Sequence, residues 1–397
     1  MISLAGRDIA HAWGKFVLTG LGLGLLIGVT LTMAGVYRGM VDDAQALLKN
    51  SGADLWVVQK DTQGPYAEAS TLKDDVVRSV RGMPGVARAA NVTYFTMQVG
   101  SASGRESRAM VVGIAPDGPG APSHLVAGRH ITRAHYEAVA DVKTGFALGE
   151  RIRIRRNTYT VVGLAQRMVS SGGDPMVFVT LADAQQAQFL KDNDAILSDR
   201  ARIAANPVFA RAGRAVVAAV QDMQTSSHAV NAVLVQVAPG ADTEAVAAPL
   251  RRWKHVAAYT QVQMQDILVA KLIATSAKQI AMFLVILSVV TAAIVAFIIY
   301  TLTMAKVREI AVLKLIGARN RTISGMILQQ ALGLGLIGFL VGRVAAGLWA
   351  PVFPKYVLLL PGDAVRGLAI VMSICALASV VAIRAALRID PAEAIGG

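Results

Sequence analysis

The stretch KVREIAVLKLIGARNR, Lys306–Arg321, lies between two long apolar runs, Ile280–Ala305 and Thr322–Gly342. It holds five basic residues and one acid, Glu309. Its apolar positions recur at the spacing of a helix, which predicts a short amphipathic helix that ends at Gly317. A basic amphipathic helix between two membrane spans either lies among lipid headgroups or docks on a cytoplasmic partner.

The composition is typical of a membrane protein. The 397 residues are 54% hydrophobic and only 16% charged, with a positive mean hydropathy, which is too apolar for an ordinary soluble domain. The formal net charge is +13, yet the chain has no nucleic-acid motif, so nucleic acid is not an expected partner. The single cysteine, Cys375, lies in an apolar run, which excludes a disulfide framework and a CxxC metal site.

The first apolar run, Phe16–Tyr37, carries no charge and is long enough to cross a hydrocarbon core, at roughly 33 Å. A cleaved signal peptide has a shorter apolar region, so we expect an uncleaved span within residues 1–37. Gly20, Gly24 and Gly28 are spaced four apart, which permits close packing of helices. The alternative is that glycine is simply common in membrane helices.

Residues 38–52 and 265–279 have helical periodicity and are predicted to form two stalk helices. Between them, residues 53–264 alternate short β-type runs with turns and helical stretches, which predicts an extracytoplasmic α+β domain with a core of its own. One of its expected helices is Leu72–Val80. The sequence leaves open whether this region forms one domain or two lobes that meet within Asp192–Val220. The β-type runs are Leu55–Val58, Val92–Val99, Ala109–Ile114, Arg151–Ile154, Tyr159–Leu164, Met176–Val179 and Val233–Val237.

Residues 280–397 are predicted to contain three further spans and a tail, 384–397. The connection Val344–Asp363 holds one basic residue and one acid, whereas segment 306–321 holds five basic residues. The positive-inside rule therefore places segment 306–321 in the cytoplasm, both termini with it, and the large domain on the other side. The predicted fold class is four transmembrane helices plus an extracytoplasmic α+β domain on a helical stalk. The three further spans are Ile280–Ala305, Thr322–Gly342 and Gly367–Ile383.

No motif for chemistry appears in the sequence. The patterns GxxxxGK[ST], HExxH and GxSxG are absent, and the six histidines are dispersed. The four spans hold no acidic residue and no histidine, which disfavours a proton-coupled carrier and an intramembrane aspartyl or metal protease. We therefore expect no catalytic residue, cofactor or metal in this chain, and an energy source outside it.

The order of these elements resembles the MacB/FtsX-like (type VII) ABC transporter permeases over nearly the whole chain. VREIAVLKLIGARNRTI, Val307–Ile323, is similar to the cytoplasmic coupling segment of that family, and RIDPAEAI, Arg388–Ile395, to its tail. TYTVVGLAQ, Thr158–Gln166, and DPMVFVTLADAQ, Asp174–Gln185, are similar to its outer domain. GADLWVVQKDTQGPYAE, Gly52–Glu68, resembles the DevC-like branch most.

The resemblance implies a non-enzymatic permease subunit of a bacterial inner membrane that pairs as a homodimer. MacB carries its ATPase ahead of the first span, and this chain begins fifteen residues before it, so the resemblance implies a separate ABC ATPase that binds ATP and Mg. Closure of the ATPases would push the coupling segments, and the stalks would pass the motion to the periplasmic domain. The DevC-like branch implies a HlyD-type periplasmic adaptor, a TolC-like outer-membrane duct and a lipid-like or amphiphilic substrate.

The coupling segment supplies the residues expected to meet the ATPase. Arg308, Lys314 and Arg319 are candidates for charged contacts, and an apolar groove would take the neighbouring isoleucine and leucines. The alternative is that the basic residues bind anionic membrane lipid, at about 1 kcal/mol each. The full set of candidates is Lys306, Arg308, Glu309, Ile310, Leu313, Lys314, Leu315, Gly317 and Arg319.

Two other functions remain open from the sequence. The first is a lipoprotein-extracting or cell-wall-hydrolase-activating relative of the same fold, which a neighbouring adaptor subunit would distinguish from an exporter. The second is a membrane-tethered sensor or binding module without an ATPase, for which segment 306–321 binds only lipid. Nothing in the sequence names the substrate.

Overall fold

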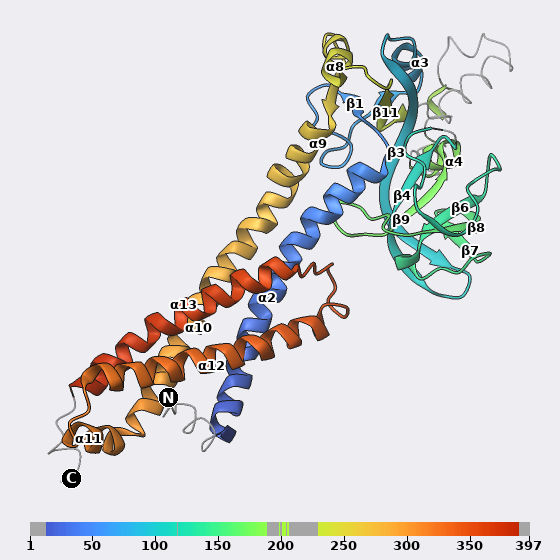
Figure 1. The fold of residues 1–397 in the computed structure, drawn as a ribbon. Helices are drawn as coiled ribbons and strands as arrows, with labels where there is room; N and C mark the ends of the chain where they lie inside the picture. The colour runs from blue at the N-terminus through green and yellow to red at the C-terminus, as the bar shows by residue number, and fades with distance from the viewer. Residues whose placement is uncertain are drawn as a thin grey trace. The chain divides into compact units, whose positions relative to one another are not determined.

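The computed structural model divides the chain into two compact units, each described by itself below (Figure 1). The membrane unit comprises Met1–Met40 and Thr275–Gly397, and the sheet unit comprises Val41–Ala274. The outer domain predicted from the sequence, residues 53–264, is therefore shorter than the sheet unit, which includes the ends of the two helices that flank it. The structure describes residues 13–116, 118–188, 198, 201–203, 205 and 229–388.

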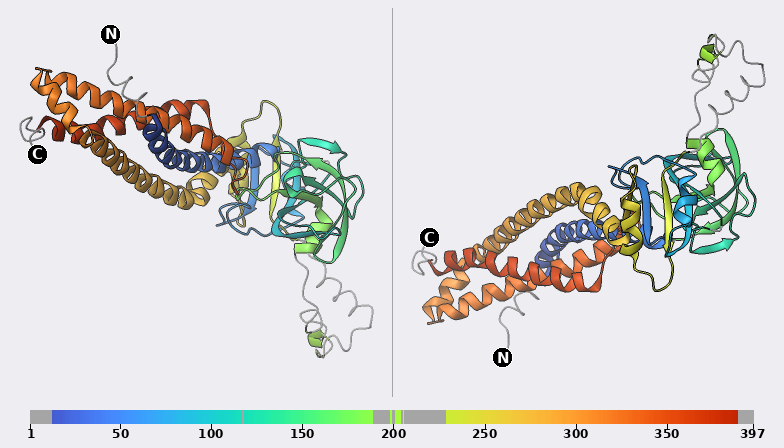
Figure 2. Two further views of the ribbon diagram at one scale, coloured as in Figure 1. Left: turned by 90° about the horizontal axis from the view of Figure 1, so that it is seen from below. Right: turned by 90° about the horizontal axis from the view of Figure 1, so that it is seen from above.

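The part of the chain that the structure describes has four helices long and apolar enough to cross a membrane. Helices α12 and α13 run alongside each other (Figure 2). The connection between them is residues 350–360 and not the predicted 344–363, because Arg343 lies inside α12 and Pro361 begins α13. Proline suits the first helical position, where its missing N–H would have no partner. The four helices are α2 (Trp13–Asn50), α10 (Ala274–Met304), α12 (Asn320–Trp349) and α13 (Pro361–Leu387).

The glycines of α2 lie against α12. A side chain on Gly20 would place its Cβ 2.7 Å from Ile337 Cγ2, and one on Gly24 would place it 2.5 Å from Val341 Cγ1. At Gly28 the Cβ would lie 3.1 Å from the carbonyl oxygen of Gly342. A larger residue would force a neighbour to move, least at Gly28, so the three glycines allow the two backbones to approach closely.

The connection between α12 and α13 packs on α2. The N–H of Leu358 donates to the carbonyl oxygen of Gly35 at 3.0 Å, and Gly39 has no room for a side chain beside the carbonyl of Tyr356. Arg38 forms an ion pair with Asp363, in the first turn of α13. The start of α13 is thus fastened to α2 by both backbone and charge.

In the sheet unit, two βαβ segments supply four antiparallel strands, in the order β12-β1-β11-β3, at one end of a ten-stranded sheet. This order is that of a split βαβ, ferredoxin-like arrangement. Apolar side chains of the strands and of both helices fill one core, which includes Leu55, Val80, Val235 and Leu250. The elements are β1 (Leu55–Gln59), α3 (Val76–Arg81), β3 (Val86–Ser101), β11 (Ala232–Val237), α8 (Thr243–Arg251) and β12 (Val256–Thr260).

A second core lies in the segment inserted between β3 and β11. Strand β3 serves both cores: it pairs with β11 up to Val92 and with β4 from Thr93 onward. From β4 the sheet continues in the order β9-β6-β8-β5, and β7 pairs with β3 and β8. The elements are β4 (Glu106–Ile114), β5 (Leu125–Gly128), β6 (Glu137–Asp141), η1 (Val142–Thr144), β7 (Arg151–Ile154), β8 (Asn157–Ala165), β9 (Met176–Thr180) and α4 (Leu181–Gln188).

Two predicted helices differ from the structure. The prediction of Leu72–Val80 is wrong at its start, because Leu72 and Lys73 form a short strand, β2, that pairs with β10 (Ala229–Val230). The predicted stalk 265–279 begins earlier, since Thr260 and Gln263 form a capping box for α9 (Gln261–Ile267). A π-helical segment, η2 (Leu268–Ile273), then joins α9 to α10. The predicted lobe junction lies largely outside the described residues.

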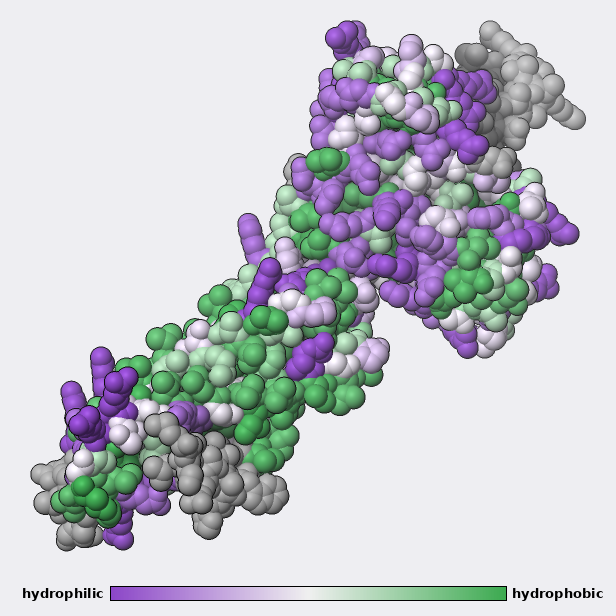
Figure 3. Space-filling model, viewed as in Figure 1, coloured by the Kyte–Doolittle hydropathy of each residue, from purple (hydrophilic) through white to green (hydrophobic). Residues whose placement is uncertain are grey.

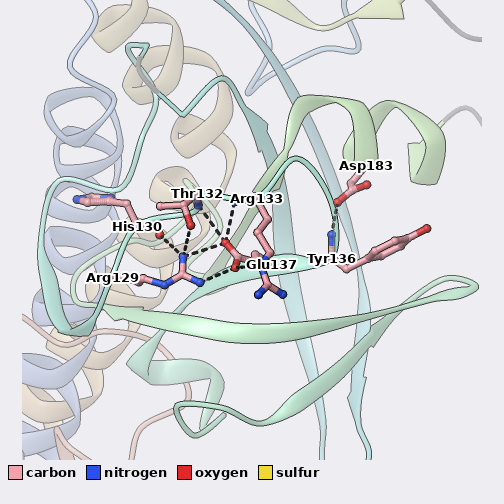
Figure 4. Close-up of polar contacts among 7 residues, drawn as sticks. All are labelled: Arg129, His130, Thr132, Arg133, Tyr136, Glu137 and Asp183. Atoms are coloured by element: carbon pink, nitrogen blue, oxygen red, sulfur yellow. Dashed lines mark hydrogen bonds and ion pairs between the residues drawn. The ribbon is translucent and has the colours of Figure 1, made fainter.

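A buried carboxylate holds the loop between β5 and β6 (Figure 4). The side chain of Glu137 is 4% exposed and accepts hydrogen bonds from Arg129 at 2.5 and 3.0 Å. It also accepts the backbone N–H groups of Thr132 and Arg133, at 3.0 and 3.1 Å. The bonds from Arg129, followed by those two N–H groups, lower the pKa of Glu137 to about 2 against the opposing effect of burial.

A second carboxylate fixes the end of the same loop. Asp183 of α4 is buried and accepts the N–H of Tyr136 at 2.9 Å, and it lies 2.7 Å from Nδ1 of His135 (Figure 4 shows the bond to Tyr136). Tyr136 has φ +65°, a backbone conformation that residues other than glycine rarely adopt. The bond to Asp183 therefore compensates for local strain in the loop.

The α2–α12 contact predicts the cost of adding a side chain. Gly24→Val should lower the free energy of unfolding by about 1–3 kcal/mol, because a Cβ there overlaps Val341. Gly22→Val is the matched control, since nothing lies within 4 Å of a Cβ on Gly22. Thermal unfolding in detergent measures both, and equal melting temperatures would contradict the close contact.

The lowered pKa of Glu137 predicts a pH dependence of stability. Its pKa falls from the ordinary 4.5 to about 2 on folding, so its stabilisation is complete above pH 4.5 and is lost as the pH falls toward 2. Glu137→Gln should therefore destabilise the protein at pH 7, by on the order of 2 kcal/mol, and much less at pH 3. Tryptophan fluorescence during thermal unfolding checks this, with the exposed Glu106→Gln as the control. A difference that does not change with pH would contradict the role of this carboxylate.

Candidate functional site

The candidate site is helix α11 (Val307–Leu315), which joins α10 to α12 in the membrane unit. The chain leaves α10 through a turn in which the N–H of Lys306 donates to Thr303 at 3.1 Å. Glu309 lies in the first turn of α11 and Lys314 in the last, the placement that the helix dipole favours.

Gly317 sets the exit from α11. Its φ is +92°, and its N–H donates to the carbonyl of Lys314 at 3.1 Å, while the N–H of Ala318 donates to Leu313 at 2.9 Å. These two bonds form a Schellman motif, which glycine adopts without strain. Arg319 then occupies the N-cap position of α12, with extended backbone and no capping bond from its side chain. The chain therefore turns from α11 to α12 at Gly317.

One face of α11 is bound to the membrane unit. Ile310 is 1% exposed and Ala311 is fully buried, and Ile310 belongs to the same core cluster as side chains of α2, α10, α12 and α13. The ammonium group of Lys314 donates to the carbonyl oxygen of Leu387, at the end of α13, at 2.9 Å. A cation at a helix C-terminus satisfies carbonyls that the helix leaves without a partner. These contacts fasten α11 to the spans.

The other face of α11 is exposed and mixes apolar and basic residues. Val312, Leu315 and Ile316 follow the i, i+3, i+4 spacing of one helix face, and Leu315 and Ile316 are 65% and 79% exposed. Arg308, on the same row of α11, and Arg319, at the N-cap position of α12 just beyond the turn at Gly317, are also exposed. We call these five residues the exposed face of α11. Figure 3 shows hydrophilic residues gathered near this end of an otherwise largely hydrophobic membrane unit.

Some of the predicted candidates are exposed in the structure, and others are buried or bonded within the chain. Arg308, Leu315 and Arg319 lie on the exposed face, where a partner could reach them. Ile310 is buried and Lys314 bonds within the chain, so neither presents itself to a partner in this structure. Of the other predicted candidates, Glu309 is exposed, Lys306 and Leu313 are half-buried, and Gly317 shapes the turn.

Val312 and Ile316 are the exposed apolar residues that sequence reasoning missed. The periodicity identified the stripe of Val307, Ile310, Ala311, Lys314 and Leu315. The spans of the chain itself cover this stripe at Ile310 and Ala311, whereas its last member, Leu315, is exposed. The available signal was the row that begins at Arg308 and continues at i+4 and i+8 on the other side of the helix. Among the described residues, no group of three or more His, Cys, Asp and Glu side chains could hold a metal ion.

Comparison with known proteins covers nearly the whole chain. Residues 16–253 match the MacB-like periplasmic core domain, and residues 281–391 match the FtsX-like permease C-terminal domain. The chain is 26% identical over 401 residues to the uncharacterized ABC transporter permease Rv0072 of Mycobacterium tuberculosis, with 100% of both chains covered. A second permease of that organism, Rv2563, is 25% identical over 402 residues, again with full coverage of both chains.

Solved structures of outer domains are also similar. The periplasmic region of MacB from Actinobacillus actinomycetemcomitans matches with a TM-score of 0.36 and 10% identity, over 54% of this chain and 93% of that one. The extracellular domain of the ABC-type transporter YknZ from Gram-positive bacteria matches with a TM-score of 0.33 and 11% identity, over 52% of this chain and 99% of that one.

The bond between Lys314 and Leu387 predicts a contribution to stability. Lys314→Met keeps the aliphatic stem but removes the donor, so the free energy of unfolding should fall by about 1.5–3 kcal/mol. Lys254→Met removes an exposed lysine of the sheet unit and should leave the melting temperature unchanged. If the two variants melt at the same temperature in detergent, the bond does not hold α11.

Proposed function

The chain belongs to the MacB/FtsX-like ABC transporter permeases, and we propose that it couples ATP hydrolysis by a separate cytoplasmic ATPase to movements of its periplasmic domain. The observation that carries this proposal is the exposed face of α11. Its apolar centre, Val312, Leu315 and Ile316, lies between Arg308 and Arg319. An apolar centre with a charged rim is the usual composition of a protein–protein contact.

The contacts of α11 support transmission of force. Because Ile310 packs in the core of the membrane unit and Lys314 bonds to α13, a push on the exposed face would move the spans together with α11. Helix α2 continues for 38 residues, from the membrane unit into the sheet unit, and would carry that motion outward. The π-helical segment Leu268–Ile273 interrupts the other connection, and such segments often mark functional sites.

The orientation and the partners form part of the same proposal. The basic segment 306–321 favours a cytoplasmic position, which puts both termini in the cytoplasm and the sheet unit in the periplasm of an inner-membrane protein. The permease would work as a homodimer. The resemblance of Gly52–Glu68 to the DevC-like branch supports a HlyD-type adaptor, a TolC-like duct and a lipid-like or amphiphilic substrate.

Docking on α11 predicts which substitution releases the ATPase. Leu315→Glu with Ile316→Glu places two charges in the apolar centre of the exposed face, so the amount of co-purified ATPase should fall at least tenfold. Leu148→Glu is the control, because Leu148 is an exposed leucine of the sheet unit. Both variants should reach normal membrane abundance. Mass spectrometry after gentle detergent extraction measures the ratio of ATPase to permease.

The same preparation distinguishes the competing functions. An ATPase together with a HlyD-type adaptor in near-equal amounts supports the tripartite exporter. An ATPase alone supports coupling without a duct, as in a lipoprotein-extracting or hydrolase-activating relative. Neither partner, even after crosslinking, contradicts the proposal and favours a membrane-tethered module.

A further inference from the structure

The membrane unit contains a cavity of about 340 Å³ between its spans. Its wall is largely apolar, with Ile27, Leu31 and Ala34 from α2 and Ile370 and Val371 from α13. Helix α10 contributes the remaining side through Leu284, Ser288 and Thr291. The volume is within the range of roughly 300–1,000 Å³ that small-molecule sites occupy.

Charged residues of one sign dominate the polar part of this lining. Arg38, Arg343 and Arg366 line the cavity together with one acid, Asp363, which Arg38 already engages. Among the described residues, Arg343 and Arg366 form no ion pair. Each arginine adjoins the end of an apolar run, Thr322–Gly342 or Gly367–Ile383, where a guanidinium can meet an anionic headgroup.

The two arginines differ in exposure: Arg343 of α12 is half-buried, whereas Arg366, in the second turn of α13, is exposed. The guanidinium of Arg343 lies beside Gly347, one turn nearer the end of α12, where a Cβ on that glycine would be 3.6 Å from Nη1. The side chain thus extends toward the helix end, as long basic side chains in membranes do.

A buried hydroxyl in the same wall also has no partner. Thr291 is 6% exposed, and its Oγ1 makes no hydrogen bond with any described residue. The other hydroxyls of the lining are satisfied: Thr30 donates to Leu26 at 2.9 Å, and Ser288 to Leu284 at 2.7 Å. Buried polar groups are normally hydrogen-bonded, so Thr291 lacks an acceptor that a ligand would supply.

We propose that this cavity binds one anionic acyl lipid. The acyl chain lies against the apolar wall, the anionic headgroup meets Arg343 and Arg366, and an ester carbonyl accepts the hydrogen bond of Thr291. A free anion would leave the apolar wall without a partner, and the cation of a zwitterionic headgroup would oppose the arginines. The site needs neither the ATPase nor the adaptor, so the inference goes beyond the proposed function.

Native mass spectrometry of the full chain in detergent tests the site. Delipidated protein is titrated with dioleoyl phosphatidylglycerol, which is anionic, and with dioleoyl phosphatidylcholine, which is zwitterionic. The unmodified chain should bind one phosphatidylglycerol about tenfold more tightly than phosphatidylcholine. Arg343→Gln with Arg366→Gln should abolish that preference, whereas Arg384→Gln with Arg388→Gln, at the other end of α13, should keep it.

A conservative variant and a blocking variant complete the test. Thr291→Val keeps the shape of the wall and should weaken phosphatidylglycerol binding several-fold, and Ala34→Phe should fill the cavity and prevent it. Equal affinities for the two lipids, an unchanged preference in the Arg343/Arg366 variant, or full competition by inorganic phosphate would overturn the proposal. If no ATPase co-purifies with the chain but the preference for phosphatidylglycerol remains, the proposed function is overturned and the lipid site is not.

Discussion

The membrane unit depends on how closely its helices can approach one another. Lipid tails are as apolar as leucine, so apolar burial gives little drive for one span to prefer another, and close packing must supply the attraction. Helix α2 comes from the opposite end of the sequence to α12, and Gly20, Gly24 and Gly28 allow the two backbones to meet. That contact holds α2 against α12, and the ion pair of Arg38 with Asp363 adds a link to α13.

The ends of α13 are fastened by polar contacts to two different elements. Its first turn is joined to α2 through Arg38 and Asp363, and its last residue accepts the ammonium of Lys314 from α11. One helix therefore links the α11 end of the membrane unit to the wall of the cavity. If α11 moves when a partner docks, α13 is the element that would transmit the movement to the wall of the cavity. This is a geometric link, and coupling along it requires two discrete arrangements of α13.

The sequence predicted the number and type of the spans well, because a run of some twenty apolar residues has few other uses. It placed their ends less well, since the helices continue beyond the apolar runs, as α12 does from Arg343 to Trp349. In the sheet unit, strands such as Arg151–Ile154 follow from alternation. The order of strands and the double role of β3 do not, because alternation tells which face is buried and not which strand is the neighbour.

The same limit applies to α11. The sequence shows the helical spacing of its apolar residues, and this spacing tells which residues share one face of the helix. It does not tell which part of the protein covers that face. Both sides of α11 carry apolar residues: Ile310 and Ala311 on one, and Leu315 and Ile316 on the other. Only the folded spans show that the first side is already covered. A docking face is thus the apolar surface that remains after the chain has packed against itself.

Polar groups in the membrane unit fall into two classes, and the difference carries meaning. Arg38, Thr30 and Ser288 all have partners within the chain, as stability alone would favour. Arg343 and Thr291 line the same cavity, yet the described residues offer the arginine no ion pair and the threonine hydroxyl no acceptor. In this wall some polar groups have hydrogen-bond or ion-pair partners and others have none among the described residues. The groups without partners lower the stability of the fold, and apolar side chains in their place would avoid that cost. Such exceptions are expected where a ligand completes the wall.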